Sequence, residues 1–233
     1  MTTVNQTQSE SKLACAGIIE RLEAERFLVL RDVVEDTIDF AGQLGEVYRL
    51  TPNHGLTVSL EIQGQGSDET PVGCLPKSLS LHTDHMVSPK PPKYVLLHCI
   101  RQDPLHPDFG ISEIVVLDSV LDVLRKTEKA LYKRLKTRDA YFAVGLDGKQ
   151  VGYPIIDDND VFRYDSDSIT DPVVDRELSD LIQSYGRFFH HALATNECLL
   201  LDNHRVLHSR GECTAPQEGS IDKPRKVVFV GID

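Results

Sequence analysis

Residues 79–101 read LSLHTDHMVSPKPPKYVLLHCIR, in which two apolar segments flank a proline-rich turn. The segments LSLH and KYVLLHCIR are each expected to form a β-strand. Residues i and i+2 of an extended chain point to the same side, so His82 and Asp84 are expected to face one point. An imidazole and a carboxylate on one face supply two of the three ligands of a 2-His-1-carboxylate site for non-haem Fe(II).

The third ligand of such a site has to come from a distant part of the chain. His208 is the candidate, because it ends an expected strand in LLLDNHRVLHSR, residues 199–210, and lies 126 residues after His82. A histidine there can also be an ordinary core or surface residue, and an HxD pattern arises by chance, so residue types alone leave the metal site open. Asp202 and Asn203 are expected to shape the turn before His208, while Arg210 either orients the site or faces solvent.

Hydrophobic periodicity and turn signals predict the remaining elements. The expected helices cover a segment around Leu13–Leu22, residues 36–44, two stretches within 119–136, and 171 to about 194. The expected strands cover 27–32, 47–50, 56–63, 111–118, 198–202, 206–208, 226–231, and a hairpin of 140–146 and 150–156 around Asp147-Gly148. Residues 64–73 form a loop by composition. Many strands with helices before and between them predict a mainly β sandwich or barrel with flanking helices, without βαβ alternation.

The length and net charge of the chain exclude some classes of function. The chain has 233 residues and a net charge of −11, which argues against nucleic-acid binding and against docking on anionic lipid. We expect a disordered tail over residues 1–10 and a single domain over 11–233. No signal peptide or apolar run long enough for a membrane span is present in the sequence, and the five cysteines are odd in number without CxxC spacing, so a cytoplasmic protein with reduced thiols is expected.

Three segments taken together resemble a known family. HTDHMVSPKPPKYVLLHCIRQDP at 82–104, LLLDNHRVLHSRGE at 199–212 and PRKVVFVG at 224–231 occur in the order seen in the TauD/clavaminate synthase-like Fe(II)/2-oxoglutarate-dependent oxygenases. Members of that family carry HT[DE], a proline pair, a strand ending in L-x-C-[LI]-R, then DN-x-R-x-x-H-x-R and a later arginine. The motifs are nearest to those of the amino-acid hydroxylases. The resemblance covers residues 79–118 and 160–233 well, and implies a double-stranded β-helix (jelly roll, cupin-like) core.

The resemblance also implies roles for single residues. His82, Asp84 and His208 take the positions of the Fe(II) ligands. Arg225 takes the position of the arginine that pairs with the distal carboxylate of 2-oxoglutarate, and Ser112 that of a hydroxyl donor to the same carboxylate. Lys226 is a weaker candidate than Arg225, and Ser112 can also be a plain strand residue. The implied reaction uses O2 to convert 2-oxoglutarate to succinate and CO2 while an unactivated C–H bond of a small molecule is hydroxylated.

The substrate is less constrained. Asp165 and Asp167 in FRYDSDSI (162–169) resemble the acidic D-x-D with which relatives hold a basic side chain, although an acidic surface loop explains them equally. Gln63 and Gln65 resemble a substrate-facing stretch of the family. Phe229 stands where several relatives place a second basic residue for a substrate acid group, which puts that mode of binding in doubt. A cationic substrate, such as a basic amino acid or a derivative in specialised metabolism, is therefore expected.

Other functions stay open at this stage. The chain could be a non-catalytic β-helix that binds a metal or ligand, or an oxygenase of the same family with a substrate that is not an amino acid. A metal-dependent hydrolase built on the His/Asp cluster would leave Arg225 without a role. The sequence does not settle the oligomeric state.

Overall fold

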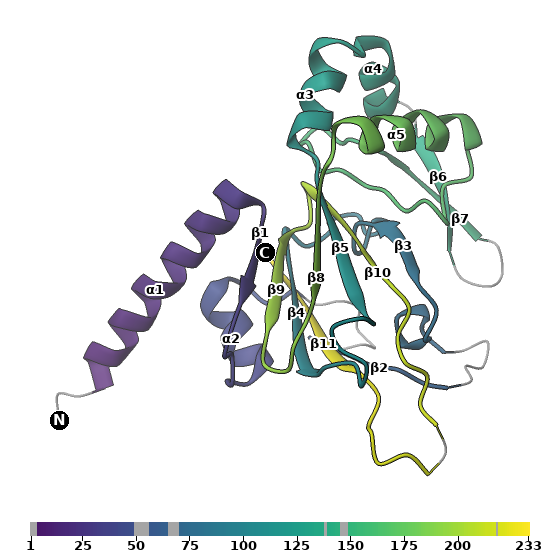
Figure 1. Ribbon diagram of the computed structural model, residues 1–233. Coiled ribbons are helices and arrows are strands. Elements are labelled where there is room, and N and C mark those ends of the chain that lie inside the picture. Colours follow the sequence, from purple (N-terminus) through teal and green to yellow (C-terminus); the bar gives the residue numbers. More distant parts are fainter. Residues whose placement is uncertain (1–3, 49–55, 65–69, 138, 145–148, 218) are drawn as a thin grey trace.

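A computed structural model describes residues 4–48, 56–64, 70–137, 139–144, 149–217 and 219–233 (Figure 1). Its helices are α1 (Val4–Glu25), α2 (Thr37–Leu44), the 3-10 turn η1 (Val72–Cys74), α3 (Asp118–Lys126), α4 (Lys129–Thr137) and α5 (Pro172–Tyr185). Its strands are β1 (Phe27–Leu30), β2 (Val58–Glu61), β3 (Leu79–His82), β4 (Tyr94–Arg101), β5 (Ile111–Val116), β6 (Asp139–Val144), β7 (Lys149–Pro154), β8 (Arg187–Ala192), β9 (Cys198–Asp202), β10 (Val206–Arg210) and β11 (Lys226–Ile232). The predicted mainly β fold with flanking helices is confirmed.

Two antiparallel sheets form the centre of the molecule. One has the strand order β1-β9-β4-β11-β2 and the other the order β3-β10-β5-β8. A fully apolar cluster joins them, with Cys99, Leu199 and Val227 from the first sheet and Ile114 and Val206 from the second. Strands from the two halves of the sequence alternate in both sheets, so segments that are far apart in the chain lie side by side (Figure 1).

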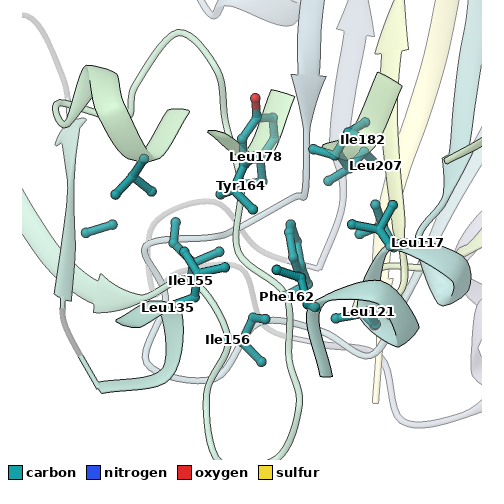
Figure 2. Packing of buried hydrophobic residues seen from close by; sticks show 14 of the residues in the cluster. Leu117, Leu121, Leu135, Ile155, Ile156, Phe162, Tyr164, Leu178, Ile182 and Leu207 are labelled. Carbon is teal, nitrogen blue, oxygen red and sulfur yellow. The ribbon is translucent and has the colours of Figure 1, made fainter. Parts of the chain in front are cut away.

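Helices cover the sheets in two groups. Helices α1 and α2 pack on the outer face of the five-stranded sheet, where Leu22, Phe40 and Leu44 contact Leu96 and Val230. Helices α3, α4 and α5 gather with the β6–β7 hairpin at one end of the sheets (Figure 1). Figure 2 shows the interior of this second group, in which the buried residues include Leu121, Leu135, Ile155, Phe162 and Leu178.

Local sequence explains where the helices begin. The Asp36 carboxylate accepts hydrogen bonds from the N–H groups of Ile38 and Asp39 at 2.9 and 3.2 Å, which caps α2. Asp171 caps α5 in the same way, and Pro172 occupies the first helical position, where its fixed φ is favourable. The expected starts of both helices are confirmed.

Helix α5 is shorter than the sequence pattern predicts, which is a correction. It ends at Tyr185, and residues 187–192, expected to be helical, form strand β8 paired with β5. Gly186 ends the helix, and the following Phe188 and Phe189 suit a strand. The aromatic residues also fit a helical apolar pattern, so hydrophobic periodicity alone wrongly predicted a helix over residues 187–192.

The N-terminal helix reaches into the segment 1–10. Helix α1 begins at Val4, and the disorder expected for this segment stays a prediction. No proline or glycine precedes Gly17, so nothing in the covalent chain stops the helix from extending toward the N-terminus.

The expected strand at 47–50 is described only in its first half. Val47 makes an isolated bridge with Ile232, while residues 49–50 lie outside the described residues. The expected turn Asp147-Gly148 also lies outside them. All five cysteines are buried and free of disulfides, as predicted. Among the described helices, none has both the length and the apolar composition needed to cross a bilayer.

Candidate metal centre

The three predicted ligands meet at one end of the four-stranded sheet. His82 is the last residue of β3, and His208 lies directly opposite it on the neighbouring strand β10. Asp84 follows β3 by two residues. One ligand atom from each of the three side chains lies within 4.8 Å of the others, so among the described residues this group could hold a metal ion. The antiparallel pairing of β3 with β10 therefore brings together ligands that are 126 residues apart in sequence.

A backbone carbonyl selects the tautomer of His82. Nδ1 of His82 lies 2.8 Å from the carbonyl oxygen of Ser80. Because a carbonyl can only accept, Nδ1 is the nitrogen that carries the proton in the neutral ring, and Nε2 is the nitrogen available to a metal ion. Nε2 lies 3.7 Å from Oδ1 of Asp84, on the side where the three ligands converge. The ring is thus held in the tautomer that a metal ion requires.

Burial determines the protonation state of His208. Its ring is buried, and this desolvation lowers the pKa of His208 from its ordinary value to about 4, against the opposing effect of Asp84. Its Nε2 lies 3.3 Å from Oδ2 of Asp84. Burial therefore keeps His208 in the uncharged form that binds metal ions.

The donor set fits a divalent metal ion. Oδ2 of Asp84 and Nδ1 of His208 are buried, and neither has a hydrogen-bond partner in the described part of the chain. A buried carboxylate oxygen without a donor is costly unless a cation satisfies it. Two imidazoles and one carboxylate suit Fe(II) with positions left open for other ligands.

A cavity of about 550 Å³ opens on this cluster. Its wall combines the three ligands with Ser112 and Arg225 and with an apolar side, formed by Val58, Leu60, Leu97, Val227 and Phe229. A cavity of this size suits a small molecule. The metal ligands thus lie in a concave site and not on an exposed surface.

Arg225 lines the same cavity. It directly precedes β11 and is buried. Gly110 packs against it: a Cβ on Gly110, which has φ +66°, would lie 3.1 Å from Cδ and Nε of Arg225. The neighbouring Lys226 is directed elsewhere, since its Nζ lies 3.7 Å from Glu61 and the residue does not line the cavity. Ser112 is buried on β5 and lines the same cavity as Arg225.

Arg210 is buried and does not face solvent. Its side chain is buried, and its guanidinium donates to the carbonyl oxygens of Gly73, Leu75 and Lys77 at 2.7, 2.6 and 2.6 Å. It therefore ties the segment around η1 to β10. Of the two alternatives expected for Arg210, solvent exposure is wrong.

The two predicted acidic residues also line the cavity. Asp165 forms an isolated bridge with His82, and its carboxylate accepts hydrogen bonds from Ser168 Oγ at 2.5 Å and from the N–H of Asp167 at 3.0 Å. Asp167 is exposed and accepts from Ser80 Oγ at 2.5 Å. Both carboxylates thus lie at the cavity wall near β3, each held by a serine.

Comparison with known proteins identifies the family. The model for "Taurine catabolism dioxygenase TauD, TfdA family" matches residues 4–225. The chain belongs to this TauD/TfdA family. L-lysine 3-hydroxylase of Catenulispora acidiphila is 27% identical over 167 residues, which cover 66% of this chain and 46% of that protein. The chain therefore spans less than half the length of this curated relative.

Solved structures share the fold of this TauD/TfdA family member. Asparagine oxygenase in complex with Fe(II), 2S,3S-3-hydroxyasparagine and succinate superposes with a TM-score of 0.73 and 18% identity, over 96% of this chain and 79% of that one. The non-haem iron oxygenase OrfP with Fe and alpha-ketoglutaric acid gives a TM-score of 0.64 and 18% identity, over 94% and 78% of the two chains. At these identities the likeness concerns the fold.

The glutamines are placed differently from the other predicted residues of this TauD/TfdA chain. Gln63 is exposed and is not among the residues that line the cavity, and its N–H donates to the carbonyl of Cys74 at 2.8 Å. Gln65 lies outside the described residues.

Two buried side chains that sequence reasoning did not assign to the site hold the loop after His82. The guanidinium of Arg163 donates to the carbonyls of Met86 and Ser88, both at 2.6 Å, and lies over the Tyr153 ring. The Asn203 amide contacts the backbone of Asp84. Their partners lie 75 to 119 residues away in sequence, so no local signal could have revealed them.

Proposed function

We propose that this protein is an Fe(II)/2-oxoglutarate-dependent dioxygenase that hydroxylates an unactivated C–H bond of a small molecule. One observation carries the proposal: a single cavity holds the His82–Asp84–His208 cluster together with the buried Arg225. Membership of a dioxygenase family supports it. So do the Fe and alpha-ketoglutaric acid or succinate in complexes of proteins with the same fold.

Each residue would contribute a defined part. His82, Asp84 and His208 would hold Fe(II) on one side and leave its other positions open. The guanidinium of Arg225 would pair with the distal carboxylate of 2-oxoglutarate through two hydrogen bonds, and the Ser112 hydroxyl would donate to the same carboxylate. Bound iron and 2-oxoglutarate would supply the oxidation by O2 that releases succinate and CO2. The apolar side of the cavity would exclude water and orient the substrate.

The fold supports the same assignment. We infer that the two sheets form the double-stranded β-helix of this family, because each combines strands from both halves of the sequence and both line the cavity that holds the three ligands. The body from residue 11 onward would then act as one domain.

We further propose that the substrate carries a positive charge, as a basic amino acid or a derivative does. Asp165 and Asp167 line the cavity next to β3, and two carboxylates there can hold an ammonium or guanidinium group. Among the similar proteins, one is named L-lysine 3-hydroxylase and another is OrfP in complex with (3S)-hydroxy-L-Arg. Phe229 lines the cavity where several family members have a basic residue, so a substrate acid group would need another partner.

Succinate formation tests the activity. We expect the protein to form succinate from 2-oxoglutarate only with Fe(II) and O2, and faster when a true substrate is present. L-lysine should be compared with the neutral L-norleucine, and L-arginine with the neutral L-citrulline. Absence of Fe(II)-dependent succinate formation under all conditions would contradict the proposed activity. Equal coupling with the charged and neutral compounds would contradict only the substrate class.

The acidic pair gives a sharper test of the substrate class. Replacing Asp165 and Asp167 with Asn keeps size and removes two charges, so coupled turnover should fall by roughly 10- to 100-fold. Decay of 2-oxoglutarate without substrate should persist, because the iron ligands are intact. Asp158→Asn is the matched control, since Asp158 is fully exposed and lies outside the cavity wall. A double variant with the same coupled turnover as this control would contradict the proposal that the substrate carries a positive charge.

A further inference from the structure

The loop that carries Asp84 lies beyond the end of the sheet. Strand β3 ends at His82, and β4 begins only at Tyr94. The chain turns sharply after Asp84, where His85 has φ 54°, a left-handed conformation that favours glycine. The β3–β10 ladder therefore stops before Asp84, and its peptide groups need partners from elsewhere.

Asn203 supplies those partners. Its Oδ1 accepts the N–H of Asp84 at 2.8 Å, and its Nδ2 donates to the carbonyl of Asp84 at 3.0 Å. The same Nδ2 donates to the carbonyl of Pro92 at 3.1 Å, and the Asn203 N–H donates to the carbonyl of Lys93 at 2.9 Å. Asn203 is only 2% exposed. One amide thus binds both ends of the loop that starts at the metal ligand.

We propose that Asn203 is a positioning residue that fixes the carboxylate of Asp84 against the two imidazoles. Asn203 lies in the turn between β9 and β10, five residues before His208 on the same segment. It therefore sets the backbone of one ligand relative to the strand that carries another. The proposal rests on the metal site of the proposed function.

The chemistry of an amide is specific to this task. Only Asn and Gln offer both an acceptor and two donors in one planar group, and Asn is the shorter. Asp at position 203 could still accept the Asp84 N–H but could not donate to the two carbonyls. Ala would remove the partner of three backbone groups, of which the carbonyl of Pro92 is buried and the two groups of Asp84 are partly buried, each at a cost. The two substitutions therefore separate the acceptor from the donors.

Amide hydrogen exchange in the metal-free protein tests the clamp without turnover. We expect Asn203→Ala to lower protection of the Asp84 N–H by at least about tenfold relative to its neighbours, and Asn203→Asp to retain most of it. The affinity for Co(II), followed by its visible absorption, should fall by roughly 10- to 100-fold in Asn203→Ala, as for other residues that orient metal ligands.

A stability control separates positioning from general destabilisation. Thr37→Val removes the buried Thr37–His98 hydrogen bond of 2.8 Å, which lies between α2 and the five-stranded sheet and outside the cavity wall. This variant should lose stability while Asp84 protection and Co(II) affinity stay within about twofold of wild type.

Unchanged Asp84 exchange in Asn203→Ala would overturn the proposal, and so would an equal loss of Co(II) affinity in Thr37→Val. If Asn203→Ala does not fold, Asn203→Asp decides: Co(II) affinity equal to that of wild type would overturn the proposal. A wild-type protein that binds no metal would contradict the proposed function, while the exchange comparison would still decide the role of Asn203.

Discussion

Buried arginines near the cavity differ in the groups that their side chains contact. Arg210 donates to three backbone carbonyls of the segment around η1, so its charge serves the fold. Arg163 does the same for the loop after Asp84. Arg225 lies against Gly110, which leaves room for its side chain beside the cavity. The residue type alone does not distinguish these roles, whereas the partners do.

The carboxylate of Asp84 is expected to be essential. Asp84→Ala removes the only carboxylate of the cluster and leaves two imidazoles, so turnover should be abolished even at matched iron occupancy. Succinate and product formation should be measured together. Asp84→Glu restores a carboxylate and should recover part of the iron affinity. Near wild-type turnover in Asp84→Ala would make the ligand assignment wrong.

Arg225 is expected to determine the affinity for 2-oxoglutarate. Arg225→Ala removes a charge-assisted pair, so the KM for 2-oxoglutarate should rise by at least about tenfold. Lys226→Ala is the matched control, because Lys226 pairs with Glu61 outside the cavity. Steady-state kinetics with 2-oxoglutarate as the varied substrate would show the difference. A larger rise in the KM for 2-oxoglutarate in Lys226→Ala than in Arg225→Ala would assign 2-oxoglutarate binding to Lys226 instead.

At the scale of secondary-structure elements, aspartate side chains cap the N-termini of α2 and α5. Asp171 accepts hydrogen bonds from the N–H groups of Val173 and Val174 at 3.0 and 3.2 Å. Asp171→Ala should therefore lower the free energy of unfolding by about 1 kcal/mol, within a range of roughly 0.5–2 kcal/mol. Urea denaturation would measure it. Asp171→Asn keeps an acceptor and should lose much less.

Elements with a local signal were predictable. The Asp caps, the apolar strands β4, β9 and β11, and the HxD pattern each depend on residues close in sequence. Strand β8 was missed because its aromatic residues also fit a helical pattern, and only pairing with β5 decides between the two. The site was predictable as far as its motifs reached: His82, Asp84, His208 and Arg225 surround one cavity. The roles of Asn203 and Arg163 depend on contacts across the fold, which a single sequence does not encode locally.

For the whole molecule, buried histidines couple stability to pH. Burial lowers the pKa of His98, His204 and His208 in the folded state, in the last case to about 4. In the unfolded chain these histidines titrate near pH 6.5. Below that pH the unfolded chain therefore binds more protons at these residues than the folded chain does, and the free energy of unfolding falls as pH falls. Burial raises the pKa of Asp202, which contributes with the opposite sign.

We therefore expect the metal-free protein to lose stability progressively between about pH 6.5 and 4.5, above the range in which most carboxylates titrate. Urea denaturation across this range, in buffers of constant ionic strength, would measure it. A free energy of unfolding that stays flat or rises toward pH 4.5 would contradict a net loss of stability from the three histidines over the opposing contribution of Asp202.

The pairing of His82 with His208 across β3 and β10 also affects the lifetime of the protein against proteolysis in a cell. An ion held by both strands binds only the folded chain, so it acts as a removable cross-link between two distant parts of the sequence. At a free concentration of 100 times its Kd, such a ligand adds about 2.7 kcal/mol to stability. Proteases act on the opened chain, and its population would fall by roughly 100-fold. Under the proposed function, iron supply would then govern the abundance of the protein as well as its activity.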